Sequence, residues 1–295
     1  MSCFHFTNIM RDKLPVLVLL FGAILWGLSW IPLKHFRDLG IEGIPLTLVG
    51  YGVVALCLLP AFIKQYPLWR SQQNYIWMIL VLSGIANLSF TSAIMHGDVI
   101  RVMVLFYLIP AWGVLGGWFF LQERMDAIRL TTVALALVGA FLVLGGLNAF
   151  NSPPSWIDGL ALLSGFALSM NNVAFRASSN LPLASKLGAI FLGSFFLATL
   201  LIIGKVQLMP IAPAFDWLMV VLFVVSWIFI ATISTQWAVT KLEVGRASIL
   251  LIVELIAAVV SAMWIASEEP SKLEILGGLL ILCAAIVETR RPKIH

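Results

Sequence analysis

Long apolar runs dominate this sequence and restrict it to one kind of fold. Ten runs are long enough to cross a bilayer, for which about 20 apolar residues are needed. They lie near residues 14–34, 44–64, 75–95, 99–121, 128–148, 156–175, 187–206, 215–240, 246–267 and 273–289. Lipid offers the backbone no hydrogen-bonding partner, so each run must be helical. The sequence therefore predicts an all-α integral membrane protein with ten transmembrane helices.

The composition agrees with a membrane protein and excludes several other classes. Hydrophobic residues make up 61% of the 295 residues and charged residues 11%, whereas soluble domains contain about 45–50% and about 25%. The net charge of +4 is scattered among loops and forms no basic stripe with interleaved aromatics, so we expect no nucleic-acid partner. The three cysteines and four histidines are dispersed. Neither a metal nor a cofactor is predicted, because no metal-binding or nucleotide-binding motif is present.

The distribution of Lys and Arg predicts the orientation. If both termini lie inside, 13 of the 18 Lys and Arg residues fall on the cytoplasmic side. The other five are Lys34, Arg37, Arg101, Lys205 and Lys272. Cytoplasmic loops normally carry the excess of positive charge. We therefore expect a multi-pass protein of the inner (plasma) membrane with both termini in the cytoplasm.

An offset of 145 residues aligns two parts of the chain. It places Asp98–Arg101 (DVIR) on Glu243–Arg246 (EVGR), so the fourth run is superimposed on the ninth. These runs are five spans apart, and the two copies would therefore cross the membrane in opposite directions. Inverted repeats of this kind are typical of secondary transporters, which bind substrate near the midplane between the repeats. The sequence thus predicts two five-helix halves, residues 1–150 and 151–295.

The same offset pairs charges near the ends of the two runs. Arg101 corresponds to Arg246, and Glu123 corresponds to Glu268. These four residues are candidates for gating contacts, with solvated loop charges as the alternative.

Glu254 is the most informative single residue. It is the only ionisable residue between Arg246 and Glu268, about 12 Å into a helix that starts at Arg246. A charged side chain there costs about 2.5–3.5 kcal/mol on insertion scales, and intramembrane acids usually mark a substrate or proton path. The alternative is a protonated carboxyl that joins two helices by a hydrogen bond.

Other polar and aromatic side chains inside the runs are candidate substrate contacts. Trp26 and Trp30 share one helix face with Ser29 beside them, which predicts an aromatic wall. Asn171 and Asn172 point about 100° apart, so at least one could face the interior. The remaining candidates are Asn87, Tyr107 and Trp227. For each residue the alternative is helix packing or bonding to its own helix.

Several of these stretches resemble a known family. The motifs are Leu25–Trp30 (LWGLSW), Leu105–Pro110 (LFYLIP) with Leu121–Arg124 (LQER), and Val253–Leu255 (VEL) with Ser267–Glu269 (SEE). Together they resemble the EamA family of the drug/metabolite transporter superfamily. The resemblance implies a central cavity between the two halves and export of amino acids or related metabolites. The family often has a proline at the position of Leu255, so we expect the ninth helix to be straighter than the fourth.

These observations predict a secondary transporter that works by alternating access. Glu254 would pair with the ammonium group of the substrate or carry a proton. Amino acids with hydrophobic or aromatic side chains fit best, and cationic amines, choline-like or drug-like compounds are the alternative. An intramembrane enzyme is a remote alternative because acid–base and metal constellations are missing. A GxxxG motif at Gly113 and Gly117 favours helix packing in a monomer, or a weak homodimer.

Overall fold

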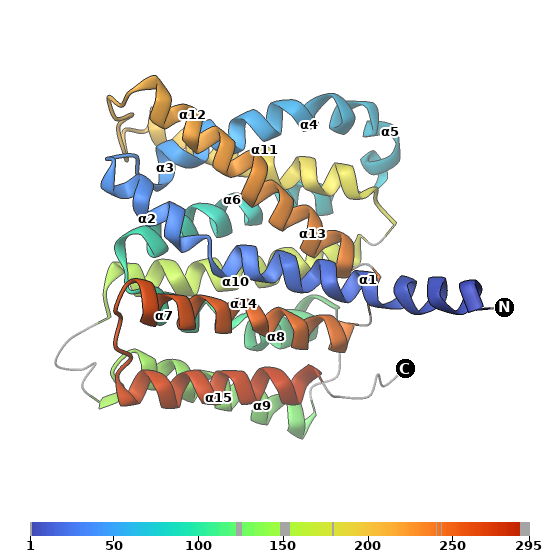
Figure 1. Cartoon of the computed structure of the whole chain (residues 1–295), viewed down its shortest axis with the longest axis vertical. Coiled ribbons are helices and arrows are strands. Elements are labelled where there is room, and N and C mark those ends of the chain that lie inside the picture. The colour runs from blue at the N-terminus through green and yellow to red at the C-terminus, as the bar shows by residue number, and fades with distance from the viewer. Residues whose placement is uncertain are drawn as a thin grey trace.

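A computed structural model describes residues 2–121, 126–147, 154–178, 180–239, 241–242 and 244–289. The description leaves out the side chains of residues 2–13, 110, 117, 120–121, 176, 244–249 and 288–289. All regular elements in these ranges are helices, and no strand occurs among them. The long helices lie side by side with roughly parallel axes. The start of α1 and the end of α15 lie at the same end of the molecule (Figure 1).

The first half of the chain contains α1 (Ser2–Gly27), α2 (Trp30–Asp38), α3 (Gly43–Leu46), α4 (Gly52–Lys64), α5 (Tyr66–Trp69), α6 (Gln73–His96), α7 (Val99–Phe106), α8 (Ile109–Leu121) and α9 (Ala127–Val143). The second half contains α10 (Trp156–Ala177), α11 (Leu183–Ile203), α12 (Ala214–Phe223), α13 (Phe229–Val239), α14 (Val244–Ile265) and α15 (Lys272–Thr289). Short π-helical turns, η1 (Thr47–Tyr51) and η4 (Val224–Ile228), join α3 to α4 and α12 to α13. A 3-10 turn, η2 (Arg70–Gln72), joins α5 to α6.

Most of the described residues in each of the ten predicted runs are helical. Among the described residues, six segments are long and apolar enough to cross a membrane: Leu14–Asp38, Gly43–Lys64, Tyr66–His96, Val99–Gly116, Leu183–Ile203 and Ala214–Val239. Two shorter apolar helices are Ala127–Val143 and Leu250–Ile265. The structure therefore confirms a helical protein with several candidate spans, while the number ten stays a prediction.

The fourth run is interrupted and the ninth is not, as the sequence predicts. The chain leaves helical geometry at Tyr107 and Leu108, between α7 and α8. Pro110 has no N–H to donate to the carbonyl of Phe106, four residues earlier, so the helix is weakened at this point. In the corresponding run, Leu255 stands at the position aligned with Pro110 and keeps its N–H, and α14 is continuous over 22 residues.

A second interruption, between α1 and α2, was not predicted. It lies at Leu28 and Ser29. The Ser29 hydroxyl donates to the carbonyl oxygen of Trp26 at 2.7 Å, and the Trp227 indole N–H donates to that of Leu25 at 2.7 Å. These side chains supply hydrogen bonds where the main-chain ladder is disturbed, which a buried membrane helix requires.

Glycines allow the central helices to approach closely. A Cβ atom on Gly84 of α6 would lie 2.7 Å from the carbonyl oxygen of Gly193 of α11, and one on Gly193 would collide with the carbonyl oxygen of Leu80. In the same way, a Cβ atom on Gly139 of α9 would lie 2.6 Å from the carbonyl oxygen of Gly277 of α15. Small residues permit such backbone contacts between membrane helices.

We expect Gly193→Ala to destabilise the protein, because the added methyl group must push α11 away from α6. Overpacking of this kind costs roughly 1–3 kcal/mol. The control is Gly159→Ala in α10, where an added Cβ would meet nothing within 4 Å. The apparent melting temperature in detergent should fall for Gly193→Ala and stay the same or rise for Gly159→Ala. Equal melting temperatures would contradict the close packing of α6 on α11.

Candidate functional site

Glu254 lies where α14 meets both interrupted helices. Its backbone is so close to α1 that a Cβ atom on Gly27 would collide with the Glu254 carbonyl oxygen. The hydroxyl of Tyr107, at the break between α7 and α8, lies beside its carboxyl group. The acid thus sits beside Gly27, the last residue of α1, and beside Tyr107, the first residue after α7.

The Tyr107 hydroxyl links the two halves of the chain through a single proton. It donates to the carbonyl oxygen of Leu251, one turn before Glu254, at 2.9 Å. A phenol has one hydrogen to donate but can also accept. While Tyr107 donates to Leu251, it can accept a hydrogen bond from a protonated Glu254. When Glu254 is ionised, the same proton can turn to its carboxylate. The direction of the Tyr107 hydrogen bond therefore depends on whether Glu254 is protonated or has an ionic partner.

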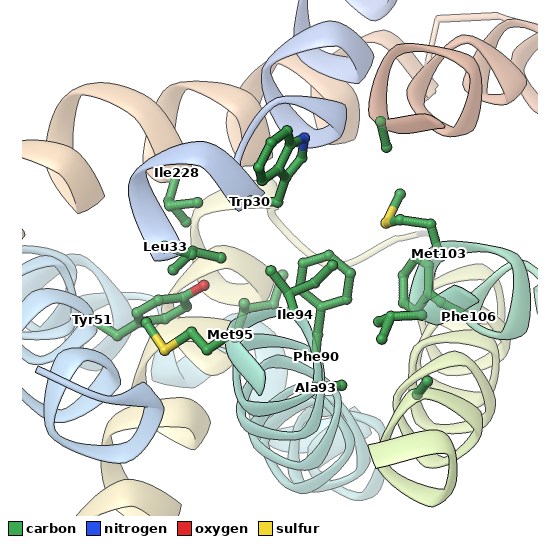
Figure 2. Packing of buried hydrophobic residues seen from close by; sticks show 14 of the residues in the cluster. Trp30, Leu33, Tyr51, Phe90, Ala93, Ile94, Met95, Met103, Phe106 and Ile228 are labelled. Carbon is green, nitrogen blue, oxygen red and sulfur yellow. The ribbon is translucent and has the colours of Figure 1, made fainter. Parts of the chain in front are cut away.

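The two tryptophans of the predicted aromatic wall lie on either side of the break between α1 and α2. Trp30 is 4% exposed and donates to the hydroxyl of Ser261, two turns after Glu254 on α14, at 2.9 Å. Trp26 packs edge-on against Phe90 of α6, with ring centroids 6.5 Å apart. Figure 2 shows Phe90 of α6 and Met103 of α7 pointing into the space between their helices, with Trp30 of α2 beside it. The indole N–H of Trp30 is therefore engaged by α14.

The predicted amide sites connect helices to one another. The Asn87 amide N–H of α6 donates to the Ser194 hydroxyl of α11 at 2.9 Å. Asn171 of α10 is 1% exposed and accepts from the Ser83 hydroxyl of α6 at 3.2 Å. Asn172 is exposed, as adjacent positions on a helix face different directions. The half-buried Asn87 and the buried Asn171 thus each bond to a serine on an adjacent helix.

Charged pairs lie at the end of the molecule away from the first residues of α1. The Arg101 guanidinium of α7 donates to both carboxylate oxygens of Asp158, at 2.7 and 3.0 Å, and lies 3.9 Å from Glu274 of α15. The Lys34 ammonium of α2 pairs with Glu268 at 3.2 Å. Both sets of contacts cross from the first half of the chain to the second. Two predicted gating residues therefore make inter-half contacts.

The contacts of the other two predicted gating residues, Glu123 and Arg246, are not described. Glu123 lies outside the described residues, and Arg246 lies in α14 with its side chain outside the description.

Sequence reasoning missed three members of these pairs: Lys34, Asp158 and Glu274. A signal existed for Asp158, because Ser155 and Asp158 have the spacing of a capping box. The structure contains this box at the start of α10, with Asp158 also accepting from the Ser155 backbone N–H at 2.8 Å. No metal site is indicated: the described part of the chain contains no group of three His, Cys, Asp or Glu side chains that could hold an ion.

Comparison with known proteins shows a family likeness in the first half of the chain. Residues 13–145 match the EamA-like transporter family. Over these residues the chain is similar to that family, which is part of the drug/metabolite transporter superfamily. The uncharacterized transporter YojE of Bacillus subtilis (strain 168) is 24% identical over 141 residues, which cover 45% of this chain and 47% of YojE. The match thus spans about half the length of that relative.

A protein of known crystal structure resembles this chain over almost its whole length. The alignment covers 93% of this chain and 95% of the other, with a TM-score of 0.60 and 18% sequence identity. At this identity the likeness concerns the fold alone. It extends well beyond residue 145, so the second half of the chain shares the fold as well.

We expect Asp158→Ala to be strongly destabilising, because Asp158 is 2% exposed and its loss leaves Arg101 without its main partner. Removing one partner of a buried pair costs about 3–5 kcal/mol, and the 27% exposure of the Arg101 side chain moves the expectation to the lower part of that range. The control is Asp38→Ala, which breaks the exposed pair Arg37–Asp38, with exposures of 36% and 64%. Exposed pairs contribute about 0–1 kcal/mol. The melting temperature in detergent should fall much further for Asp158→Ala than for Asp38→Ala. Similar falls in melting temperature would contradict a structural role for the Arg101–Asp158 pair.

Proposed function

We propose that this protein is a secondary transporter that moves amino acids with hydrophobic or aromatic side chains, or related small metabolites, by alternating access. Its ten helices form two inverted five-helix repeats, residues 1–150 and 151–295, around a central cavity. The protein lies in the inner membrane with both termini in the cytoplasm, works as a monomer or weak homodimer, and exports its substrate. The match of residues 13–145 to the EamA-like transporter family supports transport.

The observation that carries the proposal is the position of Glu254. It is the lone acid of its span, and it lies against the breaks in the first and fourth predicted spans. Interrupted helices near the midplane are typical of secondary transporters, because the freed backbone groups can bind substrate or coupling ions. An ammonium group of the substrate would pair with the Glu254 carboxylate. A proton would serve as the counter-ion when the site is empty.

The surroundings of Glu254 agree with a substrate that has an amino group and an apolar body. Trp30, Phe90 and Met103 are buried, and the last two point into the space between α6 and α7 (Figure 2). Aromatic rings bind both apolar side chains and cations.

One observation favours cationic amines as the second candidate. The indole N–H groups of Trp30 and Trp227 and the side chains of Asn87 and Asn171 all have protein partners. These groups would otherwise be natural donors to a substrate carboxylate. An amine without a carboxylate needs no such donors, and Glu254 would suffice as its charged partner.

We expect saturable counterflow in proteoliposomes that contain the purified protein, and at least about tenfold slower exchange for Glu254→Gln. Truncating one partner of a buried charge pair costs roughly 2–5 kcal/mol, which corresponds to more than tenfold. The liposomes are preloaded with leucine, phenylalanine, phenethylamine or choline. Phenylalanine and phenethylamine differ by one carboxylate and therefore separate the two substrate classes.

The matched control is Glu269→Gln, which removes an exposed acid close to the end of α14. It should exchange substrate at the wild-type rate. Exchange that Glu254→Gln leaves intact would make Glu254 a structural residue, and linear, unsaturable flux would indicate a channel.

A further inference from the structure

An acid from the second half of the chain caps the start of α7. The backbone N–H of Val99 donates to Oε1 of Glu268 at 2.9 Å, and that of Ile100 donates to Oε2 at 3.0 Å. Val99 is 0% exposed and Ile100 is 5% exposed. The first N–H groups of a helix have no partner within the helix, and a buried unsatisfied group is costly. The start of α7 therefore depends on Glu268.

The end of α14 places Glu268 at this position. The Glu268 N–H donates to the carbonyl oxygen of Ala262 at 3.3 Å, and Ser267 adopts a left-handed conformation with φ of 54°. This bond joins residues six positions apart, and a left-handed residue just past the last turn is a common way for a helix to end. The carboxylate is thus attached to α14 through a short, well-defined turn and moves with that helix.

Lys34 adds a third element to the same contact. Its ammonium lies 3.2 Å from Oε1 of Glu268, and the two side chains are only 20% and 12% exposed. Lys34 also lies 5.7 Å from the ring centre of Trp30, which is bonded to α14 through Ser261. Glu268 therefore joins α2, α7 and α14. The continuations of these same elements meet at Glu254.

Asp98 is a second acceptor for the N–H groups that Glu268 occupies. It is the N-cap residue of α7, with an extended backbone (φ −69°, ψ 128°), yet its side chain makes no capping hydrogen bond. Aspartate is among the best N-cap residues, and its short side chain bonds the N–H two or three positions on. Asp98 is exposed, and its carboxylate is adjacent in sequence to the N–H that Glu268 accepts.

We propose that Glu268 and Asp98 exchange places as the cap of α7, and that this exchange is the gate at the end of the molecule away from the start of α1. When the gate is closed, Glu268 caps α7 and pairs with Lys34. When α14 and α2 move away, Asp98 takes over the N–H of Ile100, so one of the two donors keeps a protein partner while the gate opens. The role of a gate rests on the proposed alternating access. The exchange itself concerns only the cap of α7.

The offset of 145 residues pairs Asp98 with Glu243 and Glu268 with Glu123. Both counterparts lie outside the described residues, so the inference concerns only the end that contains Glu268.

The test measures the gate directly by pulsed electron paramagnetic resonance on the full-length purified protein. Cys3, Cys57 and Cys283 are replaced by serine, and nitroxides are attached at Leu39→Cys and Lys272→Cys, both at exposed positions on the two sides of the Lys34–Glu268 contact. A long distance between the two nitroxides corresponds to the open gate and a short one to the closed gate. We expect Glu268→Gln to raise the open-to-closed ratio about tenfold, since it removes a charge-assisted cap. Glu269→Gln should leave the ratio unchanged.

The decisive variants are made in the Glu268→Gln background, where the open population is measurable. Asp98→Ala should lower the open-to-closed ratio about fivefold, the usual effect of losing an N-cap. Asp98→Asn, an equally good cap, should leave the ratio within about twofold. Asp98→Glu keeps the charge but lengthens the side chain, and it should behave like Asp98→Ala. It also replaces Asp98→Ala if that variant does not fold.

Two results would overturn the exchange. One is an unchanged distance distribution in Glu268→Gln. The other is an open population that Asp98→Ala and Asp98→Glu leave unchanged or increase. The distances do not depend on any substrate. A failure of counterflow with an intact population shift would therefore refute the proposed transport and leave the exchange standing.

Discussion

Backbone hydrogen bonding in the absence of water is the constraint on which the rest of this structure depends. Continuous helices such as α14 meet it internally, whereas each break needs a specific partner. At the break between α1 and α2, Ser29 and Trp227 supply donors to neighbouring carbonyl groups. At the start of α7, Glu268 supplies the acceptors. The places where helices are interrupted or begin inside the protein are consequently the places where the two halves are joined.

Charge is used sparingly, and two ion pairs join the halves of the chain. Arg101 is paired with Asp158, and Lys34 with Glu268, at the end of the molecule away from the start of α1. Glu254 differs, because its side-chain partner is the hydroxyl of Tyr107, which also bonds to Leu251. A neutral partner that can either donate or accept leaves the acid free to change its protonation or its counter-ion. This difference separates the candidate site from the structural ion pairs.

Much of the candidate site could be predicted, but the roles of its polar residues could not. The sequence shows which polar side chains would be costly in lipid, and Glu254, Trp30 and Tyr107 were found in this way. It does not show which neighbour satisfies each of them. Asn87 and Asn171 look equally suited to substrate binding in the sequence, yet each bonds to a serine on an adjacent helix. Their partners are 107 and 88 residues away, so no local pattern reveals them.

The sequence by itself determined the helical membrane architecture, the resemblance to the EamA family, and a ninth helix straighter than the fourth. These follow from local properties: apolar length, motif order and the missing N–H of proline. Only the tertiary structure decided that Glu268 caps α7, that Arg101 pairs with Asp158, and that the first span breaks at Leu28 and Ser29. Each of these depends on which helices are neighbours and how closely glycines let them approach. Packing of that kind is set by contacts between distant parts of the chain, which hydrophobic patterns do not encode.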